Sequence, residues 1–164
     1  MDLEGPVKEI ALAYAGLHTS AARNRLHAAR LKKDGQKAAA ELLNAVADAE
    51  EVQARRTLMH LRGKIADSQA HLVELEQTKY TAHSKRFPKI SSMLERNGQS
   101  TAAEAFEQFG EVAKNHYDLL VAVREADTVA EHYVCQVCGY IAVQEPPPKC
   151  PVCGAVTSKF KKST

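Results

Sequence analysis

The sequence predicts a mainly α-helical protein in which a bundle of four long helices is followed by a short domain of different composition. Two observations lead to this prediction. Apolar residues recur at spacings of three and four through about the first 130 residues, which is the repeat of an amphipathic helix. All four cysteines, by contrast, lie between Cys135 and Cys153. We therefore expect a helical domain over residues 1–131 and a small second domain over residues 132–164.

The first two helices are predicted from apolar stripes and from the residues that bound them. Gly5-Pro6 begins the first helix, because proline is favoured in the first turn, and Asp34-Gly35 ends it, because glycine supplies the left-handed closing residue. Its apolar stripe consists of Val7, Ile10, Tyr14, Leu17 and Ala21. The second helix is expected over residues 36–62, with Gly63 after it, and its stripe consists of Leu43, Val46, Gln53 with Ala54, Thr57 and Leu61.

Two further helices complete the predicted bundle. The third is expected from an N-cap at Asp67 to about Arg96, with a kink at Pro88. Asn97-Gly98 then interrupts the pattern. The fourth helix is expected to start after Ser100 or Thr101, and its stripe consists of Phe106, Phe109, Ala113, His116, Leu120 and Val123. Four long helices joined by short loops predict a four-helix bundle.

The tail carries the motif Cys-x-x-Cys-Gly twice, at Cys135–Cys138 and at Cys150–Cys153, with 11 residues between the two motifs. Each such turn offers two thiolates, and two turns together assemble a tetrahedral four-sulfur metal site. So short a tail also needs a cross-link or a bound metal to stabilise it, because it cannot bury enough apolar surface to fold alone. Disulfides are the alternative. The opening residues lead into no apolar signal core, and cytosolic thiols stay reduced, so we favour the metal site.

Composition and charge exclude two classes of partner. The chain has 22 Lys and Arg against 20 Asp and Glu, so it lacks the basic excess that nucleic-acid binding needs. Its longest apolar stretches, such as residues 119–123, fall far short of the ~20 residues of a membrane span. We therefore expect a soluble cytoplasmic protein that binds neither nucleic acid nor membrane.

With these motifs in place, the chain resembles the rubrerythrin family over nearly its whole length. The resemblance implies a ferritin-like four-helix bundle that houses a di-iron site, followed by a rubredoxin-like domain with one iron in four cysteines. The match in the tail comprises the ligand positions Cys135, Cys138, Cys150 and Cys153 and the surrounding aromatic residues Tyr133, Tyr140 and Phe160. The match in the bundle comprises Ala15-Gly16, Arg23-Asn24-Arg25, Phe87-Pro88 and the helix lengths.

The di-iron ligands implied by the resemblance are largely missing. Such a site takes carboxylates from all four helices and a Glu-x-x-His pair from each of two. None of the seven histidines has a glutamate three residues before it. Placed on the family's motifs, the ligand positions are occupied by Thr19, Glu50, Gln53, Lys79, Ala82, Ala113 and His116. Two iron ions cannot be neutralised in a low-dielectric core by one remaining carboxylate, so we expect no di-iron cluster and no catalytic residues.

Lys79 has two interpretations. In the first, its ammonium enters the space left by the metal and pairs with Glu50, while Gln53, Thr19 and His116 complete a polar network. In the second, Lys79 extends to the surface and Glu50 is a lone, partly solvated acid.

The link between the second and third helices bears on the oligomeric state. Residues 62–66 reach at most ~18 Å, whereas a helix of about 25 residues is ~37 Å long. The second and third helices of a ferritin-like bundle are parallel, and so short a link cannot return along the bundle. The bundle is therefore either simple up-and-down or exchanges a helix pair with a second copy. Short-linker relatives in the family look like swapped dimers, and we favour the helix-swapped homodimer.

Three functions remain open from the sequence. In the one we favour, one iron in the four cysteines transfers electrons to and from a partner protein or a larger oxidoreductase complex, while the bundle is a dimerisation and docking scaffold. In the second, the same cysteines hold zinc, which only folds the tail of a structural or interaction subunit. The third is the family's reduction of hydrogen peroxide at di-iron, which the missing ligands argue against.

Overall fold

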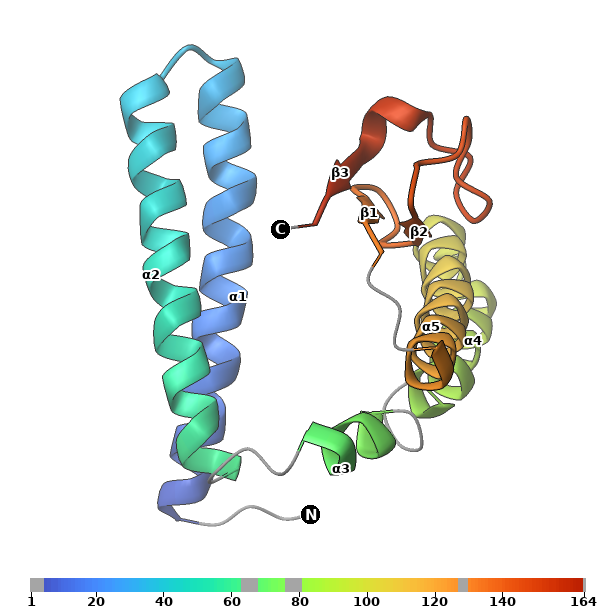
Figure 1. The fold of residues 1–164 in the computed structure, drawn as a ribbon. Coiled ribbons are helices and arrows are strands. Elements are labelled where there is room, and N and C mark those ends of the chain that lie inside the picture. The colour runs from blue at the N-terminus through green and yellow to red at the C-terminus, as the bar shows by residue number, and fades with distance from the viewer. Residues whose placement is uncertain (1–4, 63–67, 76–80, 127–129, 164) are drawn as a thin grey trace. The chain divides into compact units, whose positions relative to one another are not determined.

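The structure is a computed structural model that describes residues 5–62, 68–75, 81–126 and 130–163. The chain forms two compact units, Met1–Ala66 and Asp67–Thr164 (Figure 1). The first consists of helices α1 and α2, and the second holds the other described helices and the strands. This mainly helical fold with a small C-terminal antiparallel sheet confirms the predicted fold class. The boundary predicted at residues 131 and 132 stays a prediction.

Helices α1 (Pro6–Lys33) and α2 (Lys37–Arg62) lie side by side as an antiparallel pair (Figure 1). The turn between them is the one predicted at Asp34-Gly35. Gly35 has a φ of 80°, which only glycine adopts without strain. The N–H of Gln36 donates to the carbonyl of Leu31 at 2.9 Å and closes the end of α1. The predicted ends of both helices at this turn are therefore confirmed.

Alanines form the contact surface of this helix pair. The buried residues are spaced by seven, which keeps them on one helix face: Ala21 and Ala28 on α1, and Ala40, Ala47 and Ala54 on α2. Of the predicted stripes, only Ala21 and Ala54 belong to this set, and Val7 and Val46 are 45% and 37% exposed. The stripes were predicted from the larger apolar side chains, whereas the helices pack through the small ones.

The second unit contains the short helix α3 (Ser68–Glu74) and the longer helices α4 (Thr81–Arg96) and α5 (Ser100–Ala126). The single third helix of the prediction thus corresponds to α3 and α4, which lie on either side of residues 76–80. Residues 76–80, the predicted N-cap Asp67 and Gly63 lie outside the described residues. Helix α4 continues through Pro88. The predicted break at Asn97-Gly98 is confirmed, and Gly98 has a φ of 70°.

Helices α4 and α5 pack closely where a glycine faces a proline. A Cβ added at Gly110 would lie 3.3 Å from Cδ and Cγ of Pro88, so the absence of a side chain at Gly110 makes room for the proline ring. Next to this contact, Phe87 lies edge-on to Phe106 and Phe109, with ring centroids 5.9 and 6.1 Å away. This aromatic cluster forms an apolar contact between the two helices.

The C-terminal region folds into a three-stranded antiparallel sheet. Its strands are β1 (His132–Cys135), β2 (Ile141–Val143) and β3 (Phe160–Lys162), in the order β2-β1-β3. Tyr133 pairs with Ala142 on one side and with Lys162 on the other. The short sheet thereby brings the start of the cysteine motif at the end of β1 next to both neighbouring strands. In the described parts of the chain, no helix is both long and apolar enough to cross a membrane.

Candidate metal centre

The two cysteine motifs form two turns with the same backbone hydrogen bonds. In the first, the N–H of Gly139 donates to the carbonyl of Cys135 at 2.9 Å, and in the second Gly154 donates to Cys150 at 2.9 Å. Gly139 and Gly154 have φ values of 89° and 69°, which explains why each motif ends in glycine. We call residues 135–140 the first knuckle and residues 150–155 the second knuckle.

The knuckles bring the four cysteine sulfurs together. The Sγ atoms of Cys135, Cys138, Cys150 and Cys153 all lie within 4.8 Å of one another. The Cys135–Cys153 and Cys138–Cys150 sulfur pairs are 3.7 and 3.6 Å apart. A metal ion ~2.3 Å from each of four tetrahedral sulfurs separates the sulfurs by ~3.8 Å, whereas a disulfide needs ~2.05 Å. The arrangement fits a four-coordinate metal ion and not a pair of disulfides.

Backbone N–H groups and burial act on the thiols in opposite directions. Burial disfavours the Cys135 thiolate, but N–H groups of Cys138 and Val137 donate to it and, with the neighbouring thiols, lower its pKa to about 7. Burial raises the pKa of Cys138 and of Cys153, although N–H groups of the knuckles also donate to these sulfurs. Because a metal binds the thiolate form, the N–H groups favour metal binding at Cys135, Cys138 and Cys153.

The site is closed on most sides and approaches the surface at one cysteine. Three of its cysteines are buried, and Cys153 is half-buried. Partly buried residues pack around the sulfurs, among them Tyr140 and Phe160, as the sequence predicted. The third predicted aromatic residue, Tyr133, is half-buried, and its hydroxyl donates to Glu131 at 2.9 Å.

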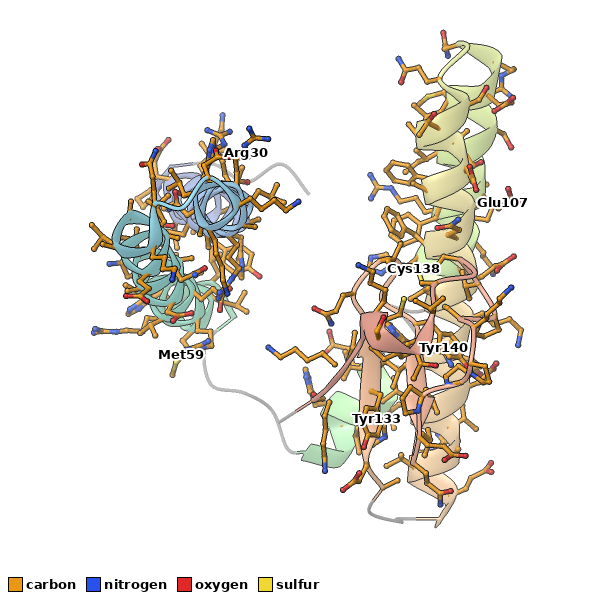
Figure 2. All side chains as sticks on the ribbon, turned by 90° about the horizontal axis from the view of Figure 1, so that it is seen from above. Arg30, Met59, Glu107, Tyr133, Cys138 and Tyr140 are labelled. Carbon is orange, nitrogen blue, oxygen red and sulfur yellow. The ribbon has the colours of Figure 1, made fainter. Side chains whose placement is uncertain are left out.

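Helix α5 also contributes to the surroundings of the cysteines, which the sequence did not reveal. Val112 belongs to the buried cluster that contains three of the cysteines. The side chains of Asn115 and His116 form hydrogen bonds with the backbone of Ile141 and Gly139. Cys138 and Tyr140 are labelled beside this helix in Figure 2. No local pattern points to these contacts, because they join residues 23 and 26 positions apart.

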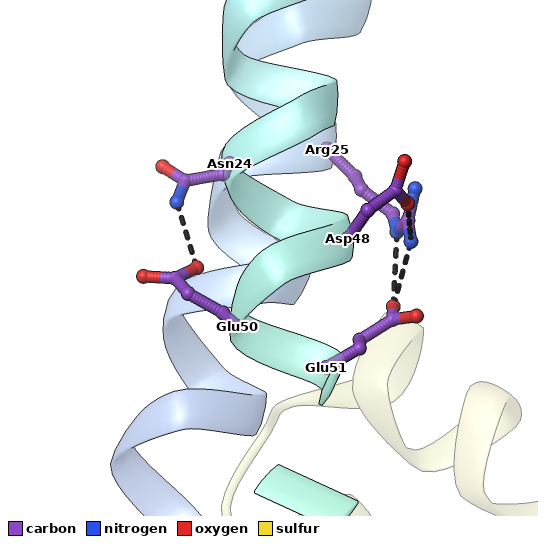
Figure 3. Close-up of polar contacts among 5 residues, drawn as sticks. All are labelled: Asn24, Arg25, Asp48, Glu50 and Glu51. Atoms are coloured by element: carbon purple, nitrogen blue, oxygen red, sulfur yellow. Dashed lines mark hydrogen bonds and ion pairs between the residues drawn. The ribbon is translucent and has the colours of Figure 1, made fainter. Parts of the chain in front are cut away.

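In the first unit, Glu50 has neutral hydrogen-bond donors as its partners. Its carboxylate accepts hydrogen bonds from Ser20 at 2.7 Å and from Asn24 at 2.9 Å. Figure 3 shows the Asn24 contact on one side of the helix pair, with the ion pairs of Arg25 on the other. The hydroxyl of Thr19 donates to the carbonyl of Ala15, and Gln53 is exposed. Among the described residues, the partners of Glu50 are Ser20 and Asn24, which the hypothesis did not include.

The other predicted di-iron positions lie in the second unit or outside the described residues. Lys79 is outside them, so neither interpretation of its role is tested. Ala82 is exposed and Ala113 is buried. Ala113 and His116 line a cavity of about 160 Å³ whose other walls are His83, Phe87, Phe109 and Val112. Among the described residues, this lining offers two imidazoles and no carboxylate to a cation.

Comparisons with known proteins agree on the tail and on the fold. Residues 133–161 match the family model of the rubrerythrin rubredoxin-like domain. The chain is similar in fold to three solved structures of nigerythrin, in the mixed-valence state, the partially reduced state and the fully reduced, all-ferrous state. The alignments cover 99% of this chain and 88–89% of the nigerythrin chains, with TM-scores of 0.54–0.55 and sequence identities of 18–19%. No curated protein matches the chain. The chain is thus similar to a rubrerythrin-type rubredoxin-like domain in sequence and to nigerythrin in fold.

Proposed function

We propose that this rubrerythrin-like protein transfers single electrons through one iron ion held by its four cysteines. The observation that supports this most directly is the set of four cysteines, three buried and one half-buried, whose sulfurs lie within 4.8 Å of one another in a segment that matches a rubredoxin-like domain. Cys135, Cys138, Cys150 and Cys153 would hold the iron, which would supply a one-electron ferric/ferrous couple for exchange with a reduced carrier protein. Because the four thiolates would stay bound in both states, little reorganisation would accompany the transfer.

The sulfur geometry suits both iron and zinc. We propose iron because residues 133–161 match the rubredoxin-like domain of rubrerythrin. The nigerythrin structures that share the fold are named for ferrous and mixed-valence states. N–H groups that donate to Cys135, Cys138 and Cys153 stabilise the negative charge of four thiolates around a ferrous ion or a zinc ion, so they are compatible with iron without selecting it.

We further propose that the helices hold no di-iron cluster. Glu50 already accepts two hydrogen bonds from α1, and the Nε2 atom of His116 lies 3.0 Å from the carbonyl oxygen of Gly139. Glu50 and His116, the two predicted positions that still carry a possible iron ligand, thus each have a hydrogen bond with a neutral group. Two iron ions would also need several carboxylates to balance their charge.

The helices are proposed instead to form a homodimer, with helix pairs exchanged between copies, that works with a redox partner or a larger oxidoreductase complex in the cytoplasm. The α1–α2 pair packs through alanines and leaves larger apolar side chains, such as Leu26 and Leu42, 74% and 65% exposed within its unit. A second helix pair would cover such a surface. Light scattering should return the mass of a dimer, and a monomer would refute this part of the proposal.

Metal analysis and a visible absorption spectrum of the purified protein test the central proposal. We expect about one iron per chain and the red colour of a ferric tetrathiolate site that bleaches on reduction. Glu50→Gln is the matched control, and it should leave the iron content unchanged because Glu50 binds no metal. One colourless zinc per chain would support the structural alternative. About three irons per chain, with turnover of hydrogen peroxide and loss of iron in Glu50→Gln, would reinstate the peroxide reductase.

A further inference from the structure

Three residues on one face of α5 contact the first knuckle and β2. Val112, Asn115 and His116 are spaced by three and four, so their side chains leave the helix on the same side. Val112 is 6% exposed, and its Cγ1 would lie 3.8 Å from a Cβ at Gly139. Gly139 of the knuckle therefore faces Val112, with room for about one methyl group between them.

Asn115 pairs with both backbone polar groups of one residue. Its Oδ1 accepts the N–H of Ile141 at 3.0 Å, and its Nδ2 donates to the carbonyl of Ile141 at 3.3 Å. Ile141 is the first residue of β2 and lies three positions after Cys138. A primary amide that meets an N–H and a carbonyl in this way fixes the backbone as a neighbouring strand would.

His116 acts on the peptide group that contacts a cysteine sulfur. Its Nε2 lies 3.0 Å from the carbonyl oxygen of Gly139. A carbonyl oxygen only accepts, so Nε2 carries the proton and donates. The N–H of the same peptide group belongs to Tyr140, and it donates to the sulfur of Cys138. One peptide group thus connects the imidazole to the metal ligand.

We propose that His116 and Asn115 are positioning residues of the metal centre, and that His116 strengthens the N–H···S hydrogen bond to Cys138 through the Gly139–Tyr140 peptide. A hydrogen bond to the carbonyl of a peptide polarises it and makes its N–H a better donor. A stronger N–H···S bond favours the more negative, reduced site and so raises the reduction potential. The effect on the potential rests on the proposed electron transfer, whereas the positioning role holds for either metal.

Two variants of His116 separate the hydrogen bond from packing. His116→Leu keeps an apolar side chain of similar bulk and removes the donor. His116→Gln retains an N–H donor at nearly the same distance from the helix. Gln108→Ala is the matched control, because it changes a neutral residue of α5 two turns away, where the described contact is with Glu104. None of the three changes introduces a charged side chain.

Reduction potential and metal loss are the two measurements. In the iron-loaded protein, His116→Leu should have a lower potential than the wild type, with His116→Gln close to the wild type and Gln108→Ala unchanged. In the zinc-loaded protein, the affinity for zinc, measured by competition with a chelator, should be about 10-fold lower in His116→Leu. This is the usual effect of removing a side chain that orients a metal ligand by hydrogen bonding. Asn115→Ala should also ease zinc removal, and it serves as the test if His116→Leu does not fold.

A spectroscopic readout keeps this inference separate from the proposed function. The amide proton of Tyr140 in the zinc-loaded protein should resonate upfield and exchange faster in His116→Leu than in the wild type, and His116→Gln should reverse both changes. A Tyr140 amide that is the same in all variants would overturn the inference, whatever the metal. If the amide responds but the native protein contains zinc, the positioning role stands and the electron-transfer function fails.

Discussion

Replacing Ala47 by leucine tests the alanine contact between α1 and α2. Ala47 is fully buried, and the hydrogen bonds that join Asn24 to Glu50 and Arg25 to Glu51 set the register of the pair, which places Ala28 level with Ala47. Leucine adds three carbon atoms at a position with no free space. We expect the helices to be forced apart and the free energy of unfolding to fall.

The size of this effect follows from two opposing terms. Burying three more carbons would stabilise the pair by about 2 kcal/mol if space were available. Because the alanines on both sides would lose their contacts as the helices separate, the net result of such overpacking is a loss of about 1–3 kcal/mol. The same change at Ala49, which is exposed within the unit, provides the control and should alter stability by less than about 0.5 kcal/mol, as surface substitutions usually do.

Urea unfolding of the metal-loaded protein, followed by circular dichroism at the helix band, measures both variants. The reasoning would be refuted if Ala47→Leu were as stable as Ala49→Leu, because the helices would then have room between them. An unchanged dependence on urea concentration is needed for the comparison, since a changed slope would mean a different unfolded state.

Three further predictions concern single contacts and the metal. Gly139→Ala should lower the unfolding free energy of the metal-loaded tail by about 1–2 kcal/mol, as measured by thermal melting, because an L-residue is strained at a φ of 89°. Hydrogen bonding by Lys162 lowers the pKa of Glu131 from its ordinary 4.5, so that contact stabilises the fold above pH 4.5 and is lost as the pH falls through the lowered pKa; carbon NMR should find the pKa of Glu131 higher in Lys162→Met. Chelation at neutral pH should unfold the sheet while helical circular dichroism persists, and a sheet that survives without metal would contradict this.

The parts of the fold predicted from the sequence are those specified by neighbouring residues. Gly35 and Gly98 mark the two helix turns because each adopts a left-handed conformation within a few residues of the helix end. The four cysteines were predicted to meet because each knuckle is a local turn. In both cases a short segment contains its own reason for the structure, and no distant contact is needed.

The contacts that the sequence did not reveal depend on how the chain returns on itself. Asn115 and His116 meet the knuckle only because the tail folds back along α5. From its position on the predicted fourth helix, His116 was predicted to be a remaining ligand of a lost di-iron site. In the structure it contacts the carbonyl of Gly139 in the first knuckle. The alanine surface was missed for another reason: periodicity analysis gives weight to large apolar residues, whereas close helix packing is decided by small ones.

The attachment of the tail to α5 has a mechanical consequence. Val112, Asn115 and His116 span about one turn of the helix, so a rotation or axial shift of α5 would move the Gly139–Tyr140 peptide with it. A protein that docks on α4 and α5 at a distance from the cysteines would thereby alter the hydrogen bond at Cys138. On the proposal that the site holds iron, its colour would then report on such docking, and the reduction potential of the iron would depend on which partner is bound.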